Sequence, residues 1–235
     1  MAAHLRGHLF IERSKIMNYK AVLFDFDYTL GDSTVPIVNS YTAALAEMGW
    51  PAPDREAVRA TIGYTLYDGY TMLTGDDDEA RRQDFFSRFK AHAGPVMIRD
   101  SVLCPGAEDV LNWLGQAGIR TGIVSTKGSD QIAGIFEKYG LRNGLSLIIG
   151  GQDVIKNKPD PEGLNLALER LGLDRAEVLF CGDTVIDAET ARRAGVDFCA
   201  VLNGTTPAEA FAEYPNVHIA PDLPELQSWL FEKGV

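Results

Sequence analysis

One stretch near the N-terminus constrains the fold more than any other part of the sequence. Four apolar residues, 21–24, run directly into two acids, Asp25 and Asp27. A short apolar run bounded by turn residues is typical of a strand buried on both faces of a sheet. Ligands of open α/β sheets bind beyond the carboxyl ends of the strands. The two acids are therefore expected to bind a cation or share a catalytic step, unless they only cap a turn or a helix.

Helical periodicity and short apolar runs alternate after residue 100. Strands are expected over 120–124, 146–149, 178–181 and 198–202, the last of which is the final strand that the pattern predicts. Helices are expected between and after them, ending with 224–232. This alternation predicts an α/β fold: a doubly wound parallel sheet, Rossmann-like, with helices on both faces.

The stretch 34–100 shows helical spacing and no strand signal, and it follows the first strand before a second one appears. It is expected to fold as a small helical bundle inserted into the α/β domain. The core domain then comprises 17–33 and 101–235. Within the insertion, 63–70 is expected to be a loop or broken helix that places Tyr64, Tyr67 and Tyr70 beside turn residues, and a helix is expected from 77 to about 93.

Composition excludes several classes of protein. The net charge of −11 argues against a sequence-independent grip on nucleic acid, which needs a basic face. No apolar run approaches the length of a membrane span. The three cysteines have no C-x-x-C spacing, so a reducing, cytoplasmic location is expected.

The first sixteen residues lack the apolar region and cleavage site of a secretory signal. We expect Met17 to be the functional start and 1–16 to be a dispensable extension or a start-site artefact. A short mitochondrial presequence is the second interpretation of this segment.

Polar side chains recur where the predicted strands end. They are Asp25 and Asp27, Ser125, and Asp183 followed by Asp187, with Lys156 and Lys158 in the irregular stretch 150–160. In a parallel sheet these strand ends meet at one edge. Mg²⁺ takes oxygen ligands and often a substrate phosphate, and an ammonium and a hydroxyl can hold the remaining phosphate oxygens. The sequence therefore favours a phosphate site built around a divalent cation.

The ordered set D-x-D-x-T, a strand-end Ser, a Lys-Pro and G-D-x-x-x-D resembles the haloacid dehalogenase-like hydrolase superfamily from Met17 to the C-terminus. The resemblance implies a doubly wound core and, with an insertion at 34–100, a mobile helical cap over the site. Ser125-Thr126-Lys127 is similar to the corresponding motif of the phosphoglycolate phosphatase-like subgroup.

The resemblance also implies roles for single residues. Asp25 would be the nucleophile that forms an aspartyl-phosphate, and Asp27 the general acid and base. Ser125 and Lys158 would bind the phosphate, with Lys156 as the second candidate for the lysine. Further substrate contacts would come from Thr29, Thr126, Tyr64 and Tyr67.

The metal implied by the resemblance is Mg²⁺. Its ligands would be Asp25, the backbone carbonyl of Asp27, and Asp183. Asp187 would lie behind these ligands and orient them or Lys158.

Together these features predict a Mg²⁺-dependent phosphomonoester hydrolase of the phosphoglycolate phosphatase type, acting on a small phosphorylated metabolite. The presence of Asp27 disfavours a dehalogenase. A β-phosphoglucomutase-like mutase is the main alternative, followed by a pyrophosphatase or nucleotidase and by a non-catalytic binding member. A receiver-type signalling domain would lack the insertion. No nucleic-acid or membrane partner is expected, and monomer and homodimer both stay open.

Overall fold

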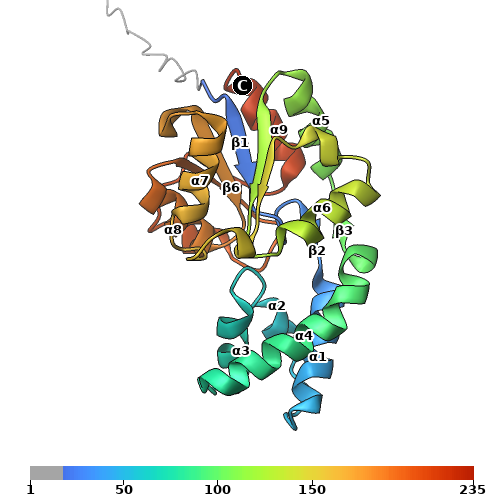
Figure 1. The fold of residues 1–235 in the computed structure, drawn as a ribbon. Coiled ribbons are helices and arrows are strands. Elements are labelled where there is room, and N and C mark those ends of the chain that lie inside the picture. The colour runs from blue at the N-terminus through green and yellow to red at the C-terminus, as the bar shows by residue number, and fades with distance from the viewer. Residues whose placement is uncertain (1–17) are drawn as a thin grey trace, which may run out of the picture.

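The computed structural model describes residues 18–235, so the predictions for 1–16 and for a start at Met17 lie outside the described residues. A parallel six-stranded sheet forms the centre of the molecule (Figure 1), in the order β5-β4-β1-β6-β7-β8. The doubly wound parallel sheet expected from the sequence is confirmed. The strands are β1 (Ala21–Phe24), β4 (Arg120–Val124), β5 (Leu147–Ile149), β6 (Val178–Gly182), β7 (Asp197–Val201) and β8 (His218–Ala220).

Helices cover both faces of the sheet, and β1 shows why. Its side chains alternate between faces: Val22 and Phe24 pack with one buried cluster, Ala21 and Leu23 with another. The first face is covered by α5 (Ala107–Gln116), α6 (Ser129–Lys138) and α9 (Leu223–Glu232), the second by α7 (Glu162–Leu171) and α8 (Val185–Ala194) (Figure 1). Single 3₁₀ turns lie at Arg142–Gly144, Gly151–Asp153, Arg175–Glu177 and Ala208–Phe211.

Two short strands link this sheet to the inserted helices. The strand β2 (Gly31–Asp32) pairs antiparallel with β3 (Val102–Leu103), so the outgoing and returning chains lie side by side. The sequence pattern indicated neither these strands nor β8. The strands β2 and β3 have only two residues each, which is too short for a pattern to show, and β8 begins with the polar His218 and so lacks the apolar run that marks β5.

The inserted segment, residues 34–100, is called the helical block below. It comprises α1 (Thr34–Glu47), α2 (Arg55–Arg59), α3 (Leu66–Thr74) and α4 (Glu79–Asp100), which lie together beyond the carboxyl edge of the sheet (Figure 1). The block has its own buried cluster, whose large aromatic members include Tyr41, Tyr70 and Phe85. That separate core supports the proposal that 34–100 is a domain inserted between 17–33 and 101–235.

Two expectations about the block need correction. Only 63–65 is loop, because Thr65 caps a helix that begins at Leu66. Helix α4 continues through Pro95 to Asp100, beyond the expected end near residue 93. The reason is a buried stripe at four-residue spacing, which runs from Phe85 to Met97 and holds the last turn against the block.

None of the helices within 18–235 combines the length and apolar character that a membrane crossing would need.

Candidate active site

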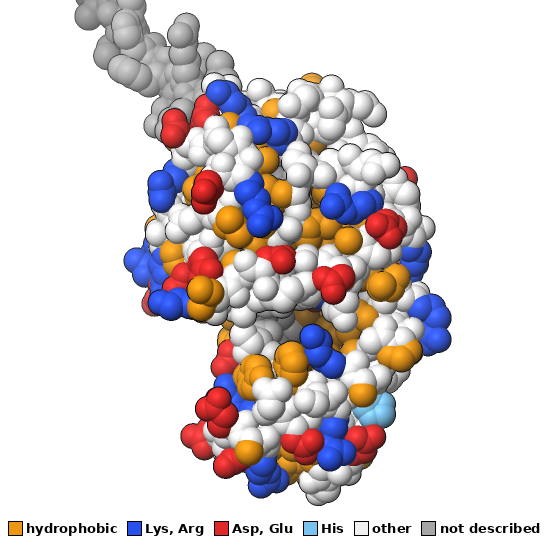
Figure 2. All heavy atoms as spheres, in the orientation of Figure 1, with side chains coloured by type: hydrophobic (Ala, Val, Ile, Leu, Met, Phe, Trp, Pro, Cys, Tyr) orange, Lys and Arg blue, Asp and Glu red, His pale blue; other side chains and the backbone are white. Residues whose placement is uncertain are grey.

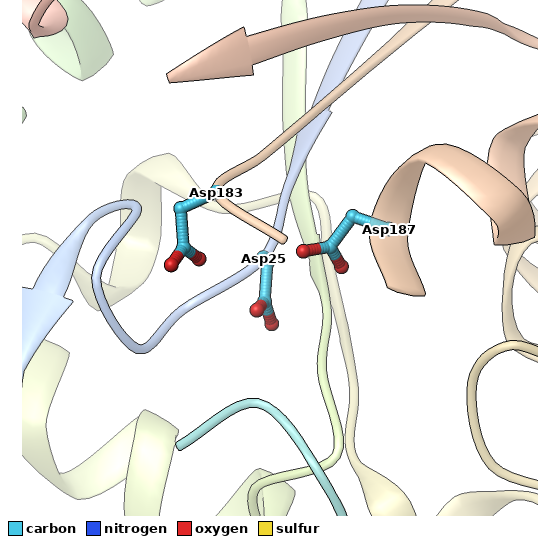
Figure 3. A group of neighbouring side chains, drawn as sticks. All are labelled: Asp25, Asp183 and Asp187. Atoms are coloured by element: carbon cyan, nitrogen blue, oxygen red, sulfur yellow. The ribbon is translucent and has the colours of Figure 1, made fainter. Parts of the chain in front are cut away.

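The predicted site residues lie together at the carboxyl ends of three adjacent strands. Asp25 directly follows β1, Ser125 follows β4 and Asp183 follows β6, while Asp187 lies in the first turn of α8. Figure 3 shows Asp25, Asp183 and Asp187 as neighbours, with the carboxylate of Asp187 turned toward Asp25. One oxygen of each lies within 4.8 Å of the others, and all three side chains are buried.

A single buried lysine pairs with two of these acids. Lys158 Nζ lies 2.9 Å from Asp25 Oδ1 and 2.6 Å from Asp187 Oδ1. Lys156, the second candidate in the sequence, is exposed. Of the two lysines, the structure therefore brings only Lys158 onto the expected nucleophile.

The pKa values of these groups are shifted, because the groups are buried with too little positive charge around them. Burial raises the pKa of Asp25 to about 6, although Lys158 and a hydrogen bond from Ser125 oppose the change. Burial, then Asp187 and Asp25, raise the pKa of Asp183 well above its usual value. Burial alone would lower the pKa of Lys158, but Asp187 and Asp25 raise it above its ordinary value. The lysine is therefore charged, and the carboxylates around it still lack positive charge.

The neighbours of Asp183 and Asp187 fix both side chains. Thr29 Oγ1 donates to Asp183 Oδ1 over 3.2 Å, and Thr184 donates to Asp187 Oδ2 from its backbone nitrogen (3.1 Å) and its hydroxyl (2.6 Å). Both oxygens of Asp187 are thus in use, one by Lys158 and one by Thr184. Thr29 is fully buried and its hydroxyl is used by Asp183. Its role as a substrate contact stays a prediction.

The donor set fits Mg²⁺. Four acids (Asp25, Asp27, Asp183 and Asp187) share this buried site with two ammonium groups, so full ionisation of the acids would leave two negative charges unbalanced. A hard divalent cation with oxygen ligands would balance them. Asp25 and Asp183 are the carboxylates placed to bind it, because Asp187 has no oxygen to spare. The carbonyl of Asp27 stays a predicted ligand.

A cavity of about 500 Å³ lies between the helical block and the loops that follow β4 and β5. Figure 2 shows the molecule hollowed between the block and the rest of the chain. The block contributes mainly apolar and aromatic walls with one cation, whereas the loops contribute polar groups. The lining includes Ile37, Tyr64, Tyr67, Phe86, Phe89 and Lys90 from the block, Asp27, Thr126, Lys127 and Asn157 from the loops, and Gln131 from the first turn of α6.

Of the three tyrosines in 63–70, two line the cavity and one is buried inside the block. Tyr64 and Tyr67 line the cavity, and Tyr67 stacks on Phe86 with ring centroids 5.4 Å apart. Tyr70 is fully buried against Phe85 within the block, so it does not face the cavity.

Comparison with known proteins identifies the family. Residues 22–201 match the family model described as haloacid dehalogenase-like hydrolase. The chain belongs to this family. The resemblance seen in the sequence is thereby confirmed, and the chain is a hydrolase of this fold.

The similar proteins of this hydrolase family include phosphatases. A phosphoglycolate phosphatase from Rhodospirillum rubrum is 30% identical over 219 residues, covering 90% of each chain. An N-acetylmuramic acid 6-phosphate phosphatase from Pseudomonas putida is 34% identical over 193 residues, covering 80% of this chain and 85% of its own. The crystal structure of a haloacid dehalogenase-like protein from Bacteroides fragilis superposes with a TM-score of 0.86 at 38% identity, covering 88% of this chain and 99% of that one.

No role in this hydrolase was predicted for Lys127 from the sequence, but its side chain contacts Asp27 in the structure. Its ammonium lies 3.2 Å from Asp27 Oδ2, and its side chain is almost fully buried. The signal was present, because Lys127 is two residues beyond the strand-end Ser125 and so falls at the same sheet edge. In the sequence, Lys127 entered only as part of the motif Ser125-Thr126-Lys127, which resembles that of the phosphoglycolate phosphatase-like subgroup.

Tyr28 was also given no role. It is the one non-glycine residue within 18–235 with a positive φ, 57°, a conformation that costs free energy and is common at functional sites. Its hydroxyl hydrogen-bonds Thr34 Oγ1 (2.6 Å) and accepts from Arg59 Nε (3.1 Å). Tyr28 therefore ties the loop that carries Asp27 to the start of α1 and to α2.

Proposed function

We propose that this haloacid dehalogenase-like hydrolase is a Mg²⁺-dependent phosphatase, which removes phosphate from a small metabolite through an aspartyl-phosphate on Asp25. One observation carries the proposal. Asp25 is buried at the carboxyl end of the central strand with Lys158 on its carboxylate, and Asp27, two residues further, faces a cavity with room for a leaving group. A nucleophile, a fixed cation and a second acid beside the leaving-group cavity are the parts that phosphoryl transfer requires.

In the first step, a carboxylate oxygen of Asp25 attacks phosphorus, and the bond from phosphorus to the leaving oxygen breaks. Asp27 gives its proton to that oxygen, so the alcohol leaves neutral. Lys158 and Ser125 bind the phosphoryl oxygens and orient Asp25. When bound at Asp25 and Asp183, Mg²⁺ would supply positive charge that stabilises the phosphoryl oxygens.

In the second step, water attacks the phosphorus of the aspartyl-phosphate and Asp27 takes its proton. The phosphorus–oxygen bond to Asp25 breaks, which releases inorganic phosphate and regenerates the carboxylate. Covalent relay thus divides one very slow hydrolysis into two easier steps.

The substrate is a phosphate monoester whose leaving group enters the cavity. Relatives named as phosphoglycolate phosphatase and as N-acetylmuramic acid 6-phosphate phosphatase support this class. A cavity of about 500 Å³ has the size of pockets that enclose whole metabolites, and Tyr67 and Phe86 give it an aromatic wall. These features favour a sugar-sized leaving group over a two-carbon acid. The three free cysteines support a cytoplasmic location.

The test is phosphate release from a panel containing phosphoglycolate, N-acetylmuramic acid 6-phosphate, hexose phosphates, nucleotides and pyrophosphate, with Mg²⁺ and with EDTA. We expect metal-dependent release, highest for a sugar phosphate, and a loss of at least about 10⁴-fold in Asp25→Asn, because an amide is not a nucleophile. Metal-independent or absent release in the wild-type protein would reject the proposal. Isomerised sugar phosphate with little free phosphate would establish a mutase instead.

A further inference from the structure

Lys127 lies where the helical block joins the rest of the chain. Its Nζ contacts four atoms of three side chains: Asp27 Oδ2 at 3.2 Å and Oδ1 at 3.4 Å, Ser33 Oγ at 3.0 Å, and Met97 Sδ at 3.3 Å. Only 8% of the residue is exposed. An ammonium has three protons to donate, so these partners satisfy it without solvent.

The partners come from three parts of the chain. Asp27 is in the loop after β1, and Ser33 is the N-cap of α1, where the chain enters the helical block. Met97 lies in the last turns of α4, shortly before the chain returns at Ser101. Ser101 Oγ donates to Ser33 Oγ over 2.9 Å, which joins the two crossing points. The ammonium therefore touches the predicted general acid, the entry to the block and the last turns of its final helix.

This arrangement links the position of the block to the carboxylate of Asp27. If α1 or α4 shifted, Ser33 or Met97 would leave the ammonium, and a buried charge without hydrogen-bond partners is costly. Lys127 would then keep fewer partners, so it would hold the Asp27 carboxyl group less firmly. In the present arrangement the block touches the loop after β4, since Thr126 Oγ1 donates to the carbonyl of Gly63.

We propose that Lys127 is a positioning residue that holds the Asp27 carboxyl group toward the leaving oxygen only while the helical block is closed over the cavity. The inference rests on the proposed function, since it concerns the acid of the same reaction. It predicts that proton donation waits for closure, and closure requires a leaving group that fits between block and loops. The ammonium also stabilises the carboxylate that remains once Asp27 has given its proton away.

Leaving groups of different basicity separate this role from others. An alkyl phosphate needs a proton on its leaving oxygen, whereas p-nitrophenyl phosphate does not. For Lys127→Met, kcat/KM should fall about 100-fold with an alkyl phosphate and by no more than about fivefold with p-nitrophenyl phosphate. Ser33→Ala keeps the ion pair and should show the same pattern with a smaller loss. Lys20→Met, which removes a half-exposed lysine at the opposite end of β1, is the matched control and should behave as wild type.

A double variant protects the test against misfolding, because Lys127→Met leaves the Asp27 carboxylate unpaired. In Asp27→Asn/Lys127→Met neither group is charged. If Lys127 acts through Asp27, the double variant should be no slower than Asp27→Asn alone. A further loss of tenfold or more would mean that Lys127 binds the phosphate directly.

Other outcomes would also overturn the inference. They are equal losses with both leaving groups in Lys127→Met, and an unchanged kcat/KM in Ser33→Ala. An active wild-type protein with such results would reject only the role of Lys127. A wild-type protein that releases no phosphate from any ester would reject the proposed function and this role together.

Discussion

At the scale of single residues, the proposed nucleophile, Asp25, lies in a buried site that is short of positive charge. The Asp25 carboxylate is buried, and Lys158 is shared with Asp187. The folded protein therefore holds a proton on Asp25 up to a pKa of about 6, whereas an unfolded chain releases it near 3.8. Stability without metal should fall as pH rises through this window, because the folded state binds more protons there.

Mg²⁺ should reverse this loss. At pH 7.5 we expect saturating Mg²⁺ to raise the melting temperature by about 5 °C or more, since a ligand at about 100 times its Kd contributes about 2.7 kcal/mol. At pH 5 the rise should be much smaller, because protons compete for the Asp25 carboxylate. Thermal unfolding with Mg²⁺ and with EDTA at both pH values measures this. Asp25→Asn should remove most of the difference, and an equal Mg²⁺ effect at both pH values would contradict the assignment.

At the scale of elements, the junction between β6 and α8 sets the position of Lys158. A Cβ on Gly182 would lie 2.5 Å from Cβ and Cγ of Asp187, so only glycine lets the helix start this close to the strand. Asp187 is then held by the reciprocal hydrogen bonds with Thr184 at the helix N-terminus. The end of β6, the N-cap of α8 and the carboxylate that pairs with Lys158 therefore depend on one another.

Gly182→Ala should therefore push α8 away from the strand. We expect a loss of about 1–3 kcal/mol in the free energy of unfolding, as for other overpacked sites, and a lower kcat because Lys158 loses its alignment. Urea denaturation and phosphatase kinetics measure the two effects. Gly115→Ala in α5 is the control, because nothing lies within 4 Å of the new methyl group. It should leave kcat unchanged and raise stability slightly. Equal behaviour of the two variants would refute the crowding argument.

Among the elements, some features of the fold and the site can be predicted from the sequence and others cannot. Five of the six strands of the sheet and the helices on its faces follow from the sequence pattern, and the meeting of Asp25, Ser125 and Asp183 follows from parallel topology. The pairing of β2 with β3 and the contacts of Lys127 depend on how two distant crossings pack. No local pattern records that packing. The burial of Thr29 behind Asp183 is likewise a tertiary result.

At the scale of the whole molecule, the block and the sheet enclose the cavity together. The tip of the block at Gly63 touches the loops on the other side: its carbonyl accepts from Thr126, and a Cβ there would lie 3.1 Å from Thr184 Cγ2. Thr126 therefore contacts the block and also lines the cavity. Binding and closure are expected to depend on each other.

Thr126→Val tests that dependence with little change of shape. The Gly63 carbonyl loses its donor, so the closed arrangement becomes less favourable and KM should rise about 3- to 10-fold, with a smaller effect on kcat. Thr42→Val is the matched control, because the Thr42 hydroxyl donates within α1 to Val38 and crosses no boundary. Steady-state kinetics on the preferred ester separates them. Unchanged KM in Thr126→Val would mean that this contact does not contribute to closure.

The position of β1 in the sheet also has a consequence for biosynthesis. This strand leaves the ribosome first, yet its neighbours are β4 and β6, which pair with it through Arg120–Ile123 and Val178–Cys181. The apolar segment that carries Asp25 must therefore stay unpaired on one side until β4 has been translated, and on the other side until β6 has been translated. Such a segment is a natural site for chaperone binding or for aggregation of nascent chains. The helical block, whose contacts are more local, can fold during that delay.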